Sequence, residues 1–145
     1  MVDVINQLVS ILQADEDLTA FCRQKWGKPL SVKKIFKRRT EINLHDLPII
    51  LITRPSIQKT YPIISAPKAS EHTVRLYYGF HQNDKRIALE ESIGYEEEID
   101  DCLSAHYSLG LPDTVLKTVS SINDEGEFHP VYFGVMDVEV THRRL

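Results

Sequence analysis

Cysteine is scarce in this sequence, with only Cys22 and Cys102 among 145 residues. Two cysteines cannot build the multi-disulfide scaffold of a small secreted domain, and their separation matches no zinc-binding pattern. No apolar run approaches the roughly 20 residues that a membrane-spanning helix needs. The N-terminus also lacks the basic and apolar regions of a signal peptide. We therefore expect a soluble, intracellular, unprocessed protein without a membrane partner.

Glycine is also sparse, and the six glycines are dispersed along the chain. None follows a strand into a helix in the arrangement of a Walker or Rossmann phosphate loop. The Gly-x-Ser-x-Gly pattern of a serine nucleophile is missing. The six histidines stand singly, without the i, i+4 pair of a helical zinc site. The sequence thus predicts no enzyme, no metal site and no cofactor.

Apolar and charged residues occur in the proportions of a globular protein. The hydrophobic fraction is 42% and the charged fraction is 26%, which excludes wholesale disorder. A chain of 145 residues has the length of one ordinary domain. Such a chain buries roughly 70% of the surface that its unfolded form exposes. We expect residues 1–145 to form a single domain with its own core.

Charge is distributed unevenly along the chain. Residues 1–72 hold 11 Lys and Arg against 7 Asp and Glu, whereas residues 73–145 hold 6 against 14. Segregated charge of this kind suits an oriented surface that docks on a partner or on another copy. Two solvated faces without a partner are the alternative. The candidate interaction residues are the basic Lys28, Lys33, Lys34, Lys37, Arg38 and Arg39 and the acidic Glu90, Glu91, Glu97 and Asp101.

The N-terminal segment predicts two short helices, over residues 2–13 and 15–25. Apolar residues recur at i, i+3, i+4 and i+7 from Ile5 onward, which places them on one helical stripe. Asp15 is a candidate N-cap of the second helix, and two further acids follow it in the first turn. Gly27 predicts the end of that helix.

Two strands are expected in the middle of the chain. Pro48–Thr53 is apolar on both faces and predicts a central strand that Pro55 ends. Residues 72–81 alternate between apolar and polar side chains and predict a second strand. Three prolines within 55–71 predict a long excursion between the two. Its apolar side chains Tyr61, Ile63 and Ile64 form a second candidate interaction surface, with a loop folded back on its own sheet as the alternative.

A third helix is expected to start near Asp84 and to end before Gly110 and Pro112. An apolar arc of about 180° on this helix comprises Leu89, Ile93, Ile99, Cys102 and Leu103. Gly94 lies inside the helix, where glycine costs about 1 kcal/mol relative to alanine, so we expect a break there.

The chain is expected to close with a β-hairpin over residues 115–122 and 131–142. Apolar residues change face along its second strand, which predicts a bulge between Gly134 and Met136. The resulting fold class is α+β, in the order α-β-β-α-β-β. We expect a four-stranded, mainly antiparallel sheet with the helices packed on one face.

The segment from Lys33 to Arg39 is a candidate nucleic-acid site, because five cations surround Phe36. The whole chain carries a formal net charge of −4, whereas a dedicated DNA-binding protein is usually basic. The negative net charge agrees better with a basic loop that faces passing DNA, or that meets the acidic surface of a partner, than with a sequence-reading DNA-binding protein.

The order and pattern of elements resemble a known protein family. The stretch Leu12–Phe21 contains a Leu-x-x-Asp-x-x-Leu pattern, and Leu47–Ile52 forms an apolar strand. A second strand, Val74–Phe80, leads into a helix that starts with Asp, Lys and Arg, and a hairpin closes the chain. This arrangement is similar to the small tail-terminator and tail-completion proteins of long-tailed bacteriophages, over nearly the whole chain.

The resemblance implies a structural role in a phage or prophage-derived tail. Proteins of this family form a homo-hexameric ring on the head-proximal end of the tail tube, stop tube polymerisation and provide the head-joining surface. The implied partners are further copies of the chain, the tail tube protein, the head–neck connector and, without sequence preference, the DNA passing through the ring. The implied location is the virion, after assembly in the bacterial cytoplasm.

Two alternatives to a tail terminator are compatible with the sequence. One is another neck or connector component, such as a head-completion or stopper protein. The other is an unrelated cellular α+β module that binds nucleic acid. We expect the basic segment of one subunit to face either the acidic 90–101 helix of the next subunit or the DNA path.

Overall fold

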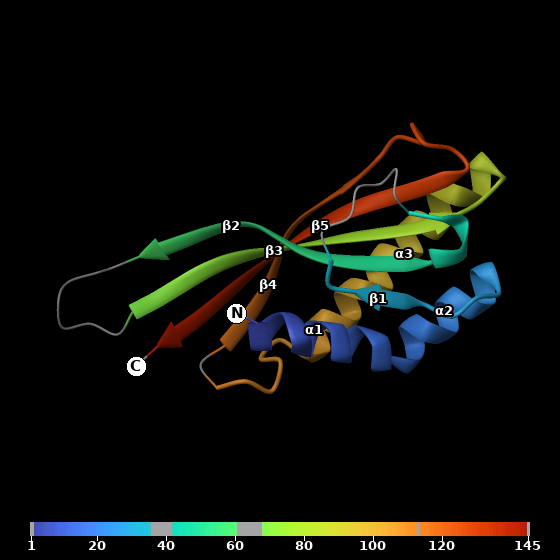
Figure 1. Ribbon diagram of the computed structural model, residues 1–145. Helices are drawn as coiled ribbons and strands as arrows, with labels where there is room; N and C mark the ends of the chain where they lie inside the picture. Colours follow the sequence, from blue (N-terminus) through green and yellow to red (C-terminus); the bar gives the residue numbers. More distant parts are fainter. Residues whose placement is uncertain (1, 36–41, 61–67, 113, 145) are drawn as a thin grey trace.

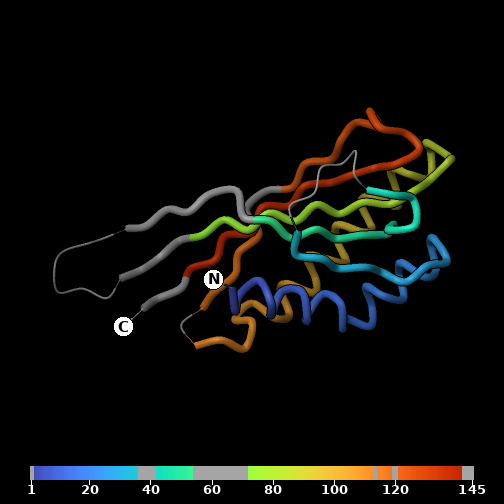
Figure 2. The backbone as a smooth tube through the Cα atoms, in the orientation of Figure 1, coloured from blue at the N-terminus to red at the C-terminus, as the bar shows by residue number. Residues whose placement is uncertain are grey.

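Three α-helices lie against a five-stranded sheet in the computed structural model, which describes residues 2–35, 42–60, 68–112 and 114–144 (Figures 1 and 2). The elements in chain order are α1 (Val2–Ala14), α2 (Glu16–Trp26), β1 (Ser31–Lys33), a 3-10 turn (Leu44–Asp46), β2 (Ile49–Thr60), β3 (Lys68–His81), α3 (Lys85–Ala105), β4 (Thr114–Asn123) and β5 (Val131–Arg144). The α+β class and the helix positions agree with the sequence prediction.

The sheet has the strand order β1-β2-β3-β5-β4. β1 runs parallel to β2, and every other neighbouring pair is antiparallel. The predicted count of four strands was therefore wrong by one, and the missed strand is β1. Three residues are too few to show the alternation that identifies a strand, so only Val32, which is buried, marks it.

The first two helices begin and end within one residue of the predicted bounds. The Oδ1 of Asp15 accepts a hydrogen bond from the backbone nitrogen of Leu18 at 2.7 Å, which caps α2. Gly27 follows α2 with a φ of 68°, in the left-handed region that glycine adopts without steric cost. Leu8, Leu12 and Leu18 point into the core and are fully buried.

Pro55 does not end β2, contrary to the prediction. The register between β2 and β3 shifts between Thr53 and Ser56 and then continues to the pair Thr60 and Ala69. The irregularity takes the proline out of the ladder, where its missing N–H would otherwise cost a hydrogen bond. The expected excursion is therefore mostly a long antiparallel extension, and the outer halves of β2, β3 and β5 run past the helices in Figure 1.

The sheet is buried on both faces at the end that carries the helices. One face packs under α1, α2 and α3 through Ile50, Leu76 and Val138, whereas Ile49 and Phe133 pack on the other face beneath Leu47. This two-sided burial explains why apolar residues change face along β5. No bulge interrupts the β3–β5 register, and the predicted irregularity lies instead in β4, between Thr118 and Ser120.

α3 runs without a break through Gly94. A Cβ at this position would lie 2.9 Å from Cε2 of Phe21 on α2, so the glycine allows two helices to approach closely. The next residue, Tyr95, is fully buried and donates a hydrogen bond to the carbonyl of Ile49 at 3.1 Å. In the described part of the chain, none of the helices combines the length and apolar character that would let it span a bilayer.

Two aromatic rings stand opposite glycines at the centre of the sheet. Tyr78 pairs with Gly134 across β3 and β5, and the adjacent Gly79 pairs with Phe133. A Cβ added at Gly134 would lie 2.0 Å from Cζ of Tyr78, and one at Gly79 would lie 2.4 Å from Cε1 of Phe133. Each ring therefore occupies the space above its partner glycine, on opposite faces of the sheet.

Replacing Gly134 with alanine should destabilise the fold by about 1–3 kcal/mol, because the new methyl group overlaps the buried ring of Tyr78. Chemical denaturation of Gly134→Ala measures this loss. In a Tyr78→Leu background, where the ring is absent, the same substitution should cost clearly less. Equal costs in both backgrounds would contradict the proposed overlap.

Candidate interaction surfaces

The two cysteines are not nucleophiles in this fold. Burial raises the pKa of both the Cys22 and the Cys102 thiol to about 12. The reactive form of cysteine is the thiolate, so both side chains stay protonated and inert at neutral pH. Within the described ranges, no three His, Cys, Asp or Glu side chains gather closely enough to hold a metal ion.

The basic candidates that the structure describes lie around β1, at one edge of the sheet. Lys28, Lys33 and Lys34 are exposed. Lys33 Nζ lies 3.7 Å from Oδ1 of Asp46, and Lys34 donates a hydrogen bond to the Asn6 side chain on α1. An exposed ion pair contributes about 0–1 kcal/mol to stability, so the contact with Asp46 leaves Lys33 accessible to a partner. Lys37, Arg38 and Arg39 lie outside the described residues, as do Tyr61, Ile63 and Ile64 of the second candidate surface.

The acidic candidates on α3 divide into exposed and buried residues. Glu90, Glu97 and Asp101 are exposed, in agreement with an interaction role. Glu91 is only 3% exposed and accepts a hydrogen bond from the Gln82 amide. Glu91 therefore positions the start of α3 and does not contribute to the outer surface, contrary to the prediction.

The apolar arc predicted for α3 was also partly wrong. Ile99, Cys102 and Leu103 are buried as expected, but Leu89 is 64% and Ile93 is 46% exposed. The inner side of the first half of α3 is occupied instead by Ala88, Ser92 and Tyr95. Two large apolar side chains thus remain in solvent beside the exposed acids.

A polar layer fixes α3 over the β4 side of the sheet. The hydroxyl of Tyr78 lies 3.0 Å from Ser121 Oγ, 3.1 Å from Asn123 Oδ1 and 3.4 Å from Glu96 Oε2. Burial raises the pKa of Tyr78 to about 12, so the hydroxyl keeps its proton and remains a donor. One helical turn earlier, Ser92 donates to Asn123 Oδ1 at 3.0 Å.

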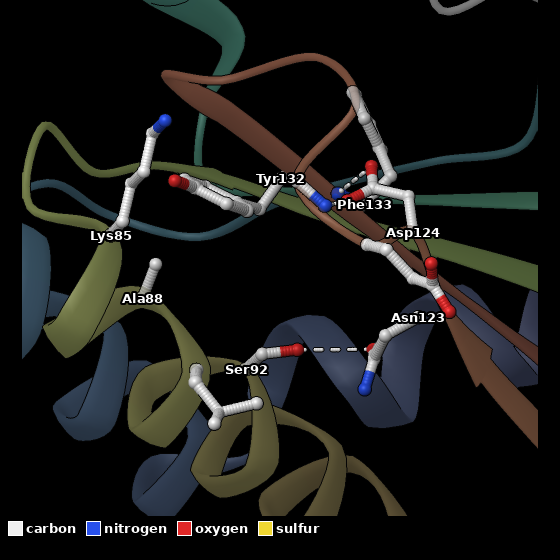
Figure 3. Close-up of a pocket in the computed structure, with 10 residues that line it drawn as sticks. Lys85, Ala88, Ser92, Asn123, Asp124, Tyr132 and Phe133 are labelled. Carbon is white, nitrogen blue, oxygen red and sulfur yellow. Dashed lines mark hydrogen bonds between the residues drawn. The ribbon is translucent and has the colours of Figure 1, made fainter.

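A hollow of about 370 Å³ opens between the first turns of α3 and the β4–β5 turn (Figure 3). Its apolar lining includes Ala88, Leu89 and Phe133. In Figure 3 Lys85 and Tyr132 lie on one side of the hollow, and Asn123 lies toward the other. The polar part of its lining includes Lys85, Ser92 and Asp124.

A second hollow, of about 250 Å³, lies at the opposite edge of the sheet. Its walls are nearly all apolar and come from the start of α1, from Ile35 beyond β1 and from Ile52 in β2. Lys34 lies at this hollow, and Val2 and Ile35 are 69% and 47% exposed. This edge therefore combines apolar surface with positive charge.

A groove of about 370 Å³ between α2 and α3 gathers four carboxylates, Asp15, Asp17, Glu98 and Asp101. Desolvation by burial raises the pKa of Glu98, and the charges of Asp101, Asp17, Asp15 and Glu97 raise it further. The sequence pattern did not single out this groove, because its acids come from two helices that meet only in the folded chain.

No protein-family model and no curated protein matches the sequence. The fold is similar to that of a chain in a solved structure described as the virion of a native gene transfer agent particle. The TM-score is 0.59, the sequence identity is 10%, and the match covers 97% of this chain and 95% of the other. At such low identity the likeness establishes a shared fold, which by itself assigns no function.

Replacing Glu98 with glutamine should stabilise the protein at pH 7. A carboxyl group whose pKa is raised by folding opposes folding when it is ionised, so the neutral amide removes this cost. The gain should shrink as the pH falls through the raised pKa of Glu98, because the wild-type carboxyl is then protonated too. Thermal unfolding between pH 7 and pH 4 measures the effect.

The matched control is Glu127→Gln, which removes an exposed acid in the β4–β5 turn, outside the groove. This variant should show no comparable gain. A gain at Glu98 that is independent of pH, or a loss of stability at pH 7, would contradict the assigned cause.

Proposed function

We propose that this chain is a structural component of a phage-like virion and, within it, the terminator of the tail tube. The observation that carries the proposal is the fold shared with a virion chain over 97% of one protein and 95% of the other. Since nearly all of both chains takes part, the likeness is not limited to a common substructure. In this role the chain acts by binding and shape and catalyses no reaction.

The distribution of charge supports assembly into a ring. The exposed basic candidates Lys28, Lys33 and Lys34 lie around β1 at one edge of the sheet. The exposed acidic candidates Glu90, Glu97 and Asp101 lie on α3, which packs over β5 and β4 near the other edge. A ring requires a heterologous contact, in which one surface meets a different surface on the next copy. Opposite charges on the two surfaces favour this contact and disfavour contacts between like surfaces.

The finer assignment is that six copies form the ring on the head-proximal end of the tube. There the ring ends polymerisation and presents a surface to the head–neck connector. Lys28 and Lys33 are available either to the neighbouring subunit or to DNA in the channel. No base-reading role is required, because phosphate contacts are independent of sequence.

Particles produced without this chain should contain tail tubes of excessive and variable length, because nothing stops tube growth. Electron microscopy of lysates from a deletion strain measures tube length, and supplying the wild-type chain in trans should restore a single length. Tubes of normal length that fail to join filled heads would contradict a terminator and indicate another neck component. Normal infectious particles would contradict any essential structural role.

A further inference from the structure

An apolar stripe runs along the outer side of α3. Leu89 and Ile93 are one turn apart, and Glu97 follows one turn later. Residues four apart lie on the same side of a helix, so these three side chains form a continuous row. Leu89 and Ile93 are 64% and 46% exposed, although the same helix buries Tyr95 and Ile99 completely.

The contacts of α3 place this row on the flank toward β4. Asp100 Oδ1 accepts a hydrogen bond from Thr118 of β4 at 2.9 Å, and Ser92 donates to Asn123 of the same strand. The opposite flank meets α2, where Gly94 packs against Phe21. At 100° per residue, Leu89 and Ile93 lie closer to Asp100 than to Gly94, and therefore away from α2.

The far edge of the sheet offers a receptor of matching character. The hollow of about 250 Å³ there is lined by the apolar Val2, Ile5, Ile35 and Ile52, with Asn6, Lys34 and Thr53 completing it. Lys34 places a positive charge at this hollow, whereas the row on α3 ends in the carboxylate of Glu97. The two surfaces therefore match in both apolar character and charge.

A single copy cannot bring these two surfaces together, because β1 and β4 are the opposite edges of the sheet. A symmetric contact in which two α3 rows ran in the same direction would place Glu97 and Glu90 against the same acids, and an antiparallel one, which sets Glu97 opposite Lys85, would leave the apolar hollow beside β1 uncovered. Two hollows facing each other would likewise oppose two Lys34 side chains. A head-to-tail contact between different copies covers both the row and the hollow, and it also pairs the acid of one with the lysine of the other.

We infer that Leu89 and Ile93 of one copy dock into the hollow beside β1 of the next copy, with Glu97 paired to Lys34. The inference rests on the proposed ring and specifies the contact that builds it. The occupant of the hollow is thus the α3 row of a second copy of this chain.

Two variants separate the halves of this contact. Leu89→Glu/Ile93→Glu replaces the apolar row with carboxylates and keeps the hollow intact. Ile35→Glu places a carboxylate in the apolar lining of the hollow and keeps the row intact. All three positions are exposed, so the fold should persist, as circular dichroism and thermal unfolding will verify. Each variant alone should have the monomer mass of 16.7 kDa by native mass spectrometry, whereas the wild type forms the ring.

Mixing the two variants gives the decisive result. The intact hollow of the first and the intact row of the second can form one contact but cannot propagate it. An equimolar mixture should therefore contain a heterodimer of twice the monomer mass and nothing larger. A mixture that stays monomeric, or a variant that alone assembles like the wild type, would overturn the inference.

Ile87→Glu serves as the matched control. Ile87 is 46% exposed, as Ile93 is, and lies on the same helix, but about 160° around the helix from Leu89. This variant should form the ring at wild-type concentration. Loss of assembly here as well would show that any acid on α3 prevents association and would overturn the specific contact.

Exchanging the charges of Lys34 and Glu97 tests the ion pair in the proposed contact. Lys34→Glu should weaken assembly at least tenfold in subunit concentration, and adding Glu97→Lys should restore most of it. Failure of the double variant to recover would overturn the pairing of these two residues.

Tail length distinguishes failure of this contact from failure of the proposed function. If the deletion strain makes overlong tubes and the Leu89→Glu/Ile93→Glu variant restores their length, the terminator role stands and this contact is wrong. Wild-type protein that is monomeric up to its solubility limit also rejects the contact. Normal tubes in the deletion strain reject the function itself, whatever the purified chain assembles into.

Discussion

The pairing of Tyr78 with Gly134 is the constraint on which the rest of the structure depends. The ring occupies the space of a missing Cβ at the sheet centre, and its hydroxyl there meets Ser121, Asn123 and Glu96. That hydroxyl links α3 to β4 and so determines which side of the helix faces outward. The exposure of Leu89 and Ile93 follows from this docking, because the inner side of α3 is already filled by small and aromatic residues.

Local signals were sufficient to predict the helices and the closing hairpin. The Asp15 cap, the Gly27 stop and the alternation over β3 each depend on residues close in sequence. Wrong predictions arose where distant residues decide the outcome. From sequence alone Gly94 predicts a helix break, because the packing of Phe21 against it appears only in the fold. The change of face along β5 likewise predicts a bulge, because the sequence does not show the second core beneath Leu47. β1 is a strand only because β2 pairs with it.

The sequence was sufficient to predict the charge of each candidate surface, but not which residues belong to it. Runs of like charge identified the basic edge and the acidic helix, since exposed charged side chains need no tertiary partner. The assignment of Glu91 failed because Gln82, beyond the end of β3, reaches it only in the fold. Leu89 and Ile93 lie at helical spacing with the buried residues, and periodicity alone cannot decide which of two adjoining apolar sides is covered.

The two edge strands of the sheet differ in length and in charge, and the proposed head-to-tail contact suits this difference. β1 offers three residues with Lys33 at its end, a short and charged edge of the kind that discourages uncontrolled pairing. β4 offers ten residues, and its Val115 and Ile122 are 53% and 69% exposed. A long edge with apolar side chains invites pairing with other chains unless something lies against it. A neighbour docked on the outer flank of α3, as we propose, would lie beside β4, and the same contact would therefore restrict access to the more vulnerable edge.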